Sequence, residues 1–211
     1  MYTPPAYAEH DGARLLACMR EWNFATLVTH GANGLNATHL PFLVDEGGAH
    51  GTLTTHLARA NAQVRDLEAG APALVIFQGP HAFVSPSWYE NRMTFPTWNY
   101  TAIHAHGTPQ LVDDTAAIHA VLTRTVALHD TPLGGEWAFG AMPEALTASR
   151  LKAIMALRMP IARIEGKMKL NQDKSVADRR GVIAALERRG DAQSVAVADL
   201  IRAQPDLATP T

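Results

Sequence analysis

The chain has 211 residues, of which 47% are hydrophobic and 18% charged, a composition that excludes a disordered protein and allows one well-buried domain, alone or with a helical appendage. Lysine and arginine total 18 against 20 acidic residues, so the formal net charge of −2 provides no general attraction for nucleic acid, and DNA binding requires a local basic patch. No apolar run in the sequence approaches the length of about 18 residues that a membrane span requires, and no signal-peptide pattern occurs. The single cysteine, Cys18, allows no internal disulfide. We therefore expect a cytoplasmic protein without membrane contact.

The first half of the chain predicts a helix followed by short strands. Residues 11–22 begin with a capping Asp11 and place apolar residues at helical spacing. Runs of β-forming residues, separated by glycine-rich turns, predict strands at residues 24–30, 35–45, 49–57, 72–79 and 81–85. A short helix is expected at residues 58–70, and a kink is expected at Pro80.

The second half predicts fewer strands and more helices. Strands are expected at residues 98–113 and 160–170. Helices are expected at residues 114–129, 143–157, 175–190 and 191–204. Consecutive short strands with few βαβ crossovers favour an antiparallel sheet, so the pattern predicts an α+β fold with a barrel core and peripheral helices.

Hydrogen-bond donors gather where the third strand is expected to run into the short helix. The donors are Thr54, Thr55, His56 and Arg59. Together with backbone N–H groups at the start of a helix they suit a phosphate, although a polar strand end with an ordinary cap is an equally simple interpretation. Thr38 and His39 lie on a neighbouring strand, and His39 comes close to His56 if the two strands pair.

Two further clusters could serve a ligand. Trp98, Asn99 and Tyr100 offer rings and polar groups for a flat aromatic ligand, while core packing or subunit contact explains them as well. His104 and His106 project to one face of a strand, but no third ligand at a recognisable spacing accompanies them. We therefore predict no metal site, and haem ligation by one histidine stays open.

Basic residues recur near the C-terminus. Lys167 and Lys169 share one face of a strand, where they could neutralise a phosphate or face solvent. Four arginines in the first C-terminal helix could contact DNA phosphates or a partner, namely Arg179, Arg180, Arg188 and Arg189. Acidic residues lie among these arginines, which favours a solvent-exposed helix face over a DNA-binding one. Nucleophilic catalysis has little support, because Cys18 lacks an adjacent base and no GxSxG motif occurs.

Six segments carry a more specific pattern, namely MYTPPAY, HLPFLV, HLARAN, VIFQGPHAFVSPSWY, PTWNYTAIHAHG and KMKLNQDKSVADRRGV. In order and spacing they resemble the PaiB-like family, also called FMN-binding negative transcriptional regulators. The family is similar to the pyridoxamine-phosphate-oxidase-like proteins, which bind FMN at a homodimer interface. The resemblance implies an antiparallel six-stranded split β-barrel with peripheral helices, an FMN-binding domain at residues 1–172 and a helical C-terminal extension at residues 173–211.

The resemblance also implies a cofactor site. The FMN phosphate is expected at Thr54, Thr55, His56, Arg59 and Asn61, with Thr38 and His39 alongside. Trp98 and Asn99 are expected near the flavin, and Lys169 and Gln172 are expected from the opposite subunit. Two motifs depart from the common spellings: Ala62 and Val64 replace a proline and a tryptophan, and NQDKS replaces SQNRS.

Three functions follow from this resemblance and from the residues. The first is an FMN-binding homodimer that acts as a repressor, with DNA as a partner. The second is an FMN-dependent oxidoreductase acting on a small substrate, for which no residue announces a proton donor, so the catalytic residues stay unknown. The third is a haem-binding split barrel that uses His39, His56 or His81.

Overall fold

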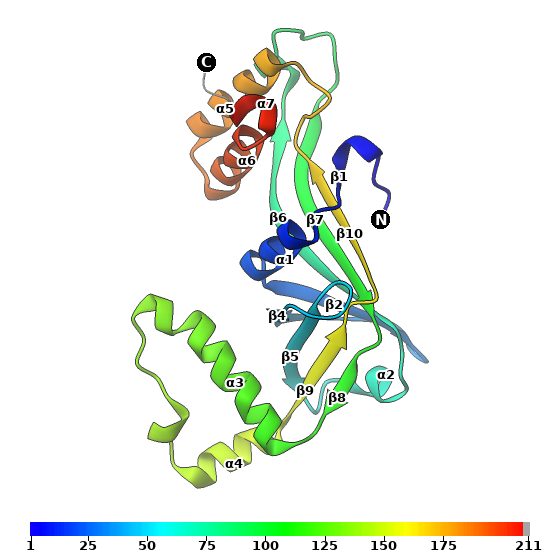
Figure 1. The fold of residues 1–211 in the computed structure, drawn as a ribbon, viewed down its shortest axis with the longest axis vertical. Coiled ribbons are helices and arrows are strands. Elements are labelled where there is room, and N and C mark those ends of the chain that lie inside the picture. The colour runs from blue at the N-terminus through cyan, green and yellow to red at the C-terminus, as the bar shows by residue number, and fades with distance from the viewer. Residues whose placement is uncertain (209–211) are drawn as a thin grey trace. The chain divides into compact units, whose positions relative to one another are not determined.

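A computed structural model of the protein describes residues 1–208, whose strands form two sheets. The larger sheet has the order β1-β10-β7-β6-β2-β3 (Figure 1). Its strands are β1 (Ala8–Glu9), β2 (Phe24–Gly31), β3 (Gly34–Pro41), β6 (Ala73–Val84), β7 (Thr97–Gly107) and β10 (Arg163–Lys169). The smaller sheet has the order β4-β5-β9-β8. Its strands are β4 (Leu43–Asp45), β5 (Thr52–Ala58), β8 (Gln110–Val112) and β9 (Ile154–Pro160).

Helices make up the remaining regular structure of residues 1–208. The α-helices are α1 (Gly12–Glu21), α2 (Val64–Glu68), α3 (Thr115–His129), α4 (Glu144–Lys152), α5 (Val176–Arg189), α6 (Ala192–Arg202) and α7 (Pro205–Ala208). Short 3₁₀ helices are η1 (Pro5–Tyr7), η2 (Pro86–Trp88), η3 (Thr131–Leu133) and η4 (Phe139–Ala141). Within residues 1–208, no helix combines the length and apolarity that a membrane crossing needs.

The chain divides into two compact units. Unit 1 contains Met1–Asp11, Gln78–Ile103 and the chain from Glu165 onward, and unit 2 contains Gly12–Phe77 and His104–Ile164. Strands β6, β7 and β10 contribute residues to both. The boundary that the sequence suggests near residue 172 stays a prediction, and residues 209–211 of the expected extension lie outside the described residues.

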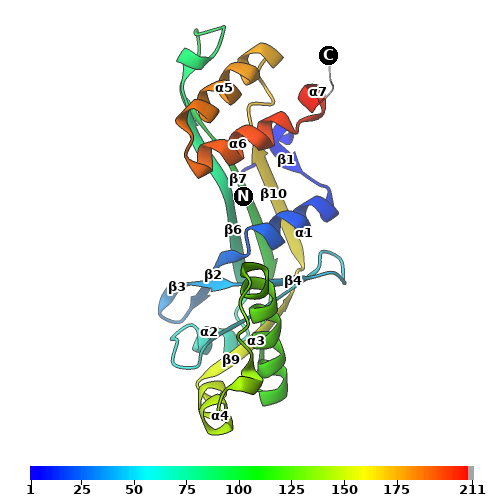
Figure 2. The same cartoon turned by 90° about the vertical axis from the view of Figure 1, so that its left-hand side faces the viewer.

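Unit 2 contains the β2–β3 hairpin and the smaller sheet. In the hairpin, Gly31 pairs with Gly34, whose φ of 96° suits a glycine, which confirms the predicted Asn-Gly turn. On the smaller sheet, α3 and α4 pack a compact core that consists of Leu43, Ile118, Val121, Leu151 and Ala156. Figure 2 shows α3 and α4 as neighbouring helices of this unit.

Unit 1 contains the C-terminal helices, which Figure 1 shows lying together. The Ser175 hydroxyl caps α5 by accepting from the Asp178 N–H at 3.0 Å, and Asp191 caps α6 by accepting from the Ser194 N–H. Helix α5 lies so close to η2 that a Cβ on Gly181 would stand 2.1 Å from the Trp88 carbonyl oxygen. The close approach therefore requires glycine at this position.

The α+β class with antiparallel strands is confirmed, while several expected boundaries were wrong. The expected helix at residues 143–157 ends at Lys152, and Ile154–Pro160 forms β9. Met155, Leu157 and Met159 alternate into the core, but the apolar Ile154 and Ala156 make the start of the strand continuous with the preceding helical pattern in the sequence.

Four further boundaries differ, two of them because of local backbone contacts. The expected helix at residues 58–70 is reduced to α2, because the segment before it forms turns that include the hydrogen bond from the Asn61 N–H to the Ala58 carbonyl. The expected strand at residues 35–45 is interrupted at Phe42, whose N–H donates to Asn23 instead. Strand β6 runs through Pro80 without a break, and the expected strand at residues 98–113 is divided between β7 and β8.

Candidate functional site

Seven of the predicted phosphate ligands lie in unit 2, and we call them the strand-tip cluster: Thr38, His39, Thr54, Thr55, His56, Arg59 and Asn61. The structure brings Thr38 and Asn61 together, with the Asn61 Nδ2 donating to the Thr38 Oγ1 at 3.0 Å. The Asn61 Oδ1 accepts from the Gln63 N–H at 2.9 Å. Both side chains therefore already bind other parts of the chain and fix the turn that precedes α2.

The three consecutive residues of β5 do not form one donor set. Thr55 is 1% exposed and donates its hydroxyl to the Pro41 carbonyl at 2.6 Å. Thr54 and His56 project to the other face, because side chains alternate along a strand. The His56 Nδ1 is buried without a hydrogen-bond partner in the described chain, and burial lowers the pKa of this imidazole. His56 is therefore neutral near pH 7, where it is a weaker phosphate ligand than an imidazolium.

Arg59 is the strongest anion ligand of the strand-tip cluster, and an acid of the same unit already holds it. Its guanidinium makes a bidentate contact with the Asp113 carboxylate, with Nη1 3.1 Å from Oδ2. It also donates to the carbonyls of Lys152 and Ile154. The contact raises the pKa of Arg59 and lowers that of Asp113, so both groups are charged. A phosphate that binds Arg59 bidentately has to displace Asp113.

His39 does not meet His56 by strand pairing. Strand β3 pairs with β2 in the larger sheet, whereas β5 lies between β4 and β9 in the smaller one. The exposed His39 ring stacks on Phe24, with ring centroids 6.5 Å apart. The prediction that His39 lies close to His56 required their strands to pair, and these strands do not pair.

Arg158 was missed by the sequence reasoning. It is exposed on β9 and stands directly opposite Thr54 in the ladder, so both side chains share one face. Recognising the alternation of Met155, Leu157 and Met159 would have placed Arg158 on a strand beside this cluster.

The remaining predicted cofactor residues lie in unit 1. Trp98 is 54% exposed and its neighbour Asn99 is fully buried, because consecutive residues of β7 face opposite sides. The Trp98 ring lies 6.0 Å from Phe83 and 6.3 Å from His81 between centroids. These three residues, which we call the aromatic face, offer a partly exposed platform for a planar ring.

Asn99 has unused hydrogen-bonding capacity. Its Oδ1 and Nδ2 are both buried and have no hydrogen-bond partner within residues 1–208. A buried amide left unpaired costs about 1–3 kcal/mol, and such groups are rare in folded proteins. The amide offers both an acceptor and donors, which is the combination that the polar edge of a flavin ring needs. The chemistry of this residue therefore fits the cofactor, on the face opposite to Trp98.

The two C-terminal ligands of the predicted site serve the local backbone. Lys169 donates to the Trp98 carbonyl at 3.0 Å and to the Thr97 hydroxyl. The Gln172 Oε1 accepts from the Leu170 N–H at 2.7 Å, and its Nε2 donates to the Met168 carbonyl. Lys169 thus links β10 to β7, and Gln172 fixes the turn after β10.

The unusual NQDKS spelling forms a compact polar cluster in unit 1. Asp173 and Lys174 form an ion pair at 2.8 Å, and Tyr7 binds Asp173 with a pKa raised by burial and by that carboxylate. Asn171 adopts a φ of 62° and donates to the Tyr89 hydroxyl at 2.7 Å. The acidic residue at position 173 is therefore paired with the lysine that follows it.

The histidine pair lies on β7, and the arginine set lies on α5. His104 and His106 share a face of β7, with ring centroids 6.4 Å apart, as strand alternation predicts. Arg179 is 4% exposed and binds Gln204 and Asp206, so the expectation that it faces DNA was wrong. The other three arginines of the set are exposed, namely Arg180, Arg188 and Arg189.

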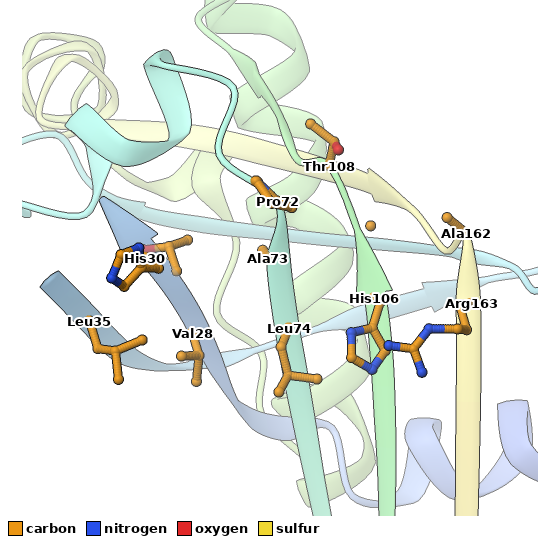
Figure 3. A pocket seen from close by; sticks show the side chains of 12 residues that line it. Val28, His30, Leu35, Pro72, Ala73, Leu74, His106, Thr108, Ala162 and Arg163 are labelled. Carbon is orange, nitrogen blue, oxygen red and sulfur yellow. The ribbon is translucent and has the colours of Figure 1, made fainter. Parts of the chain in front are cut away.

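A shallow pocket of about 570 Å³ lies on the larger sheet within unit 2. Figure 3 shows side chains from five strands lining it, namely Leu35, Val28, Leu74, His106 and Arg163. Along β2, Leu27 and Thr29 face the core while Val28 is only half-buried. Leu35 is 75% exposed, so this outer sheet face presents apolar side chains that the unit does not fully cover.

Comparisons with known proteins address the family and the fold. The family described as “Putative FMN-binding domain” matches residues 1–163. The protein named protease synthase and sporulation protein PAI 2 from Bacillus subtilis (strain 168) is 31% identical over 204 residues, which cover 95% of this chain and 96% of that protein.

Two solved structures share the fold. The flavocytochrome Anf3 from Azotobacter vinelandii has a TM-score of 0.60 at 18% identity and covers 77% of this chain and 69% of its own. The FAD and heme binding protein from Mycobacterium smegmatis has a TM-score of 0.57 at 22% identity and covers 85% of this chain and 80% of its own. These similarities support the mixed fold with antiparallel strands that the sequence predicts, which the described residues build as one sheet of six strands and one of four.

Proposed function

The chain belongs to the PaiB-like family of FMN-binding domains, and from this premise we propose that it is a homodimeric FMN-binding protein that acts as a negative transcriptional regulator. The observation that carries the cofactor proposal is Asn99, a fully buried amide without a hydrogen-bond partner within residues 1–208, on the face of β7 opposite to the exposed Trp98. Packing within the chain does not explain an exposed tryptophan and an unpaired buried amide, whereas FMN binding, as in this family, explains both.

Each unit carries its own proposed FMN ligands. Arg59 and the exposed Arg158 provide positive charge for the phosphate, and Thr54 adds a hydroxyl. The aromatic face offers stacking for a planar ring, whereas Asn99 offers an amide donor and acceptor on the opposite face of β7. When bound, FMN supplies reversible one- or two-electron transfer.

A second copy of the chain is the proposed partner. The outer sheet face carries half-buried apolar residues, which include Val28, Leu74 and Ile76. Contiguous apolar surface of this kind is typical of an association site, because burying it removes apolar area from water. In such a dimer, Lys169 and Gln172 of the partner subunit are proposed to approach the cofactor, as the family resemblance implies.

The regulatory role needs contacts to DNA phosphates. Helix α5 carries three exposed arginines, namely Arg180, Arg188 and Arg189. Arg189 also forms an ion pair of 3.3 Å with Asp191. Exposed ion pairs contribute little, so phosphate can replace this carboxylate. The proposed DNA contact therefore uses these three residues without Arg179.

A cofactor titration tests the first part of the proposal. Adding FMN to the purified protein should quench flavin fluorescence, and sedimentation should give twice the mass of the chain. Trp98→Ala should weaken FMN binding about tenfold, since stacking pairs contribute about 0.5–1.5 kcal/mol beyond area burial. Trp137→Ala, at a comparably exposed tryptophan, is the matched control. A Soret band without flavin absorbance would instead favour haem.

A DNA-binding selection tests the regulatory part. Random-sequence duplexes retained by the protein should be lost when Arg180, Arg188 and Arg189 are all replaced by alanine, while FMN binding is unchanged. Rapid turnover of NADH or NADPH, without DNA retention, would show an oxidoreductase instead.

A further inference from the structure

A second pocket, of about 650 Å³, lies in unit 2 between the β2–β3 hairpin and α2. It is lined by His30, Gly31, Ala32, Asn33, Asn36, Ala62, Arg65, Asp66, Ala69 and Ala71. Four of these residues are alanines and one is glycine, so the pocket walls carry little side-chain bulk. The space is consequently large enough for a small organic molecule.

Asp66 supplies a buried negative charge to this pocket. The residue is 8% exposed, and its Oδ2 accepts from the Thr29 hydroxyl and the Asn36 amide, both at 2.7 Å. These two neutral donors lower the pKa of Asp66, so the carboxylate is ionised. Within residues 1–208, the structure gives no cation bound to it.

The other carboxylate oxygen, Oδ1, is not needed to hold α2 in place. It stands 1.7 Å from the position that a Cβ on Gly31 would take, so glycine at this position makes room for it. No hydrogen bond to Oδ1 occurs within residues 1–208, whereas Oδ2 already joins α2 to β2 and β3. Oδ1 is thus an ionised acceptor that can serve a ligand.

Arg65 supplies the opposite charge. It is exposed, it lines the same pocket, and within the described chain its guanidinium has neither a hydrogen bond nor an ion pair. A simple cation would be repelled by Arg65, and a phosphate would be repelled by Asp66. A molecule with an ammonium at one end and a carboxylate at the other satisfies both residues.

We propose that this pocket binds a small zwitterion of the amino-acid class, with its ammonium on the Asp66 Oδ1 and its carboxylate on Arg65. The four alanines leave room for the side chain of such a ligand. Neither of the proposed FMN phosphate ligands Arg59 and Arg158 lines this pocket. A regulator of this design would sense a metabolite independently of its cofactor.

Calorimetric titration of the full chain tests this proposal, with each of the twenty common L-amino acids in turn and with methylammonium and acetate as half-ligands. At least one amino acid should bind, and both half-ligands should bind at least about tenfold more weakly, since each makes only one charged contact. Arg65→Ala should weaken binding of the amino acid about tenfold or more, whereas Arg92→Ala, at an exposed arginine outside the proposed sites, should not.

A pocket-filling variant provides a second test that does not disturb Asp66. Ala69 is exposed, so Ala69→Phe should fold normally while blocking the pocket and removing amino-acid binding. FMN affinity should stay within twofold. Three results would overturn the proposal: no amino acid binds at millimolar concentration, binding survives both variants, or Ala69→Phe impairs FMN binding instead.

Discussion

The strand-tip cluster and the aromatic face both carry residue types suited to a flavin nucleotide, but they differ in how many of their polar groups are already bonded. In the strand-tip cluster, Arg59, Thr55 and Asn61 all bind other parts of the chain. On the opposite side of β7 from the aromatic face, both polar atoms of Asn99 are buried and have no hydrogen-bond partner within residues 1–208. A sequence motif predicts which hydrogen-bond donors are present. Only the structure shows whether these donors already bind other parts of the chain, which a ligand would then have to displace.

This difference has an energetic consequence. A phosphate at Arg59 gains a bidentate ion pair but loses the one with Asp113, so the net gain is smaller than the new contact alone. A hydrogen bond to Asn99 relieves an existing cost instead. The two regions should therefore respond differently to substitution.

The largest effect is expected at Arg59. Arg59→Ala should reduce FMN affinity about 100-fold, because a bidentate contact with a phosphate is stronger than the exposed ion pair with Asp113 that it replaces. Asp113→Asn should raise the affinity, since it removes the competing charge while keeping the shape of the side chain. Fluorescence titration measures both variants. If Asp113→Asn weakens FMN binding, Asp113 positions Arg59 and does not compete with the phosphate.

A somewhat smaller effect on stability is expected at Gly31, beneath the strand-tip cluster. Gly31→Ala should lower the free energy of unfolding by about 2 kcal/mol, because its Cβ displaces Asp66 from Thr29 and Asn36. Urea denaturation gives the value. Gly140→Ala, where a Cβ meets nothing within 4 Å, should change it by less than about 0.5 kcal/mol. Equal effects at both glycines would contradict this account of Asp66.

At Asn99 we expect opposite effects on stability and binding. Asn99→Leu should raise the unfolding free energy of the FMN-free protein by about 1 kcal/mol, since it removes two unpaired buried groups. It should reduce FMN affinity about tenfold. Asn171→Leu is the matched control, and it should destabilise the protein because Asn171 has a partner in Tyr89. A stabilised Asn99→Leu protein with normal FMN affinity would show that Asn99 does not bind the cofactor.

The smallest effect is a pH dependence at His56. Burial lowers the pKa of His56 from 6.5, so the unfolded chain binds a proton more readily than the folded protein. The stability that neutral His56 contributes is complete above pH 6.5 and is lost as the pH falls through the lower folded pKa. Urea denaturation of the FMN-free protein between pH 7.5 and pH 5 should show this slope, and His56→Gln should flatten it. Identical slopes would refute the assignment.

The sequence predicted the α+β class, the β2–β3 hairpin and the helices α1, α3, α5 and α6, because apolar periodicity and turn residues act locally. It misplaced β9, where adjacent apolar residues conceal the alternation, and it therefore missed Arg158. It predicted a longer helix before Val64, where side-chain and backbone contacts of Asn61 stabilise turns instead.

For the candidate site, the sequence by itself determined which chemical groups are available: guanidinium, hydroxyl, imidazole, indole and amide at specific positions. Tertiary structure alone decided which of them remain available, because Asp113 reaches Arg59 across 54 residues of sequence and Asp206 reaches Arg179 across 27. Likewise, the alternation of β7 sends Trp98 and Asn99 to opposite faces, but only the packing of distant segments leaves one exposed and the other buried without a partner. Long-range contacts of this kind depend on how the whole chain packs, which no local pattern encodes.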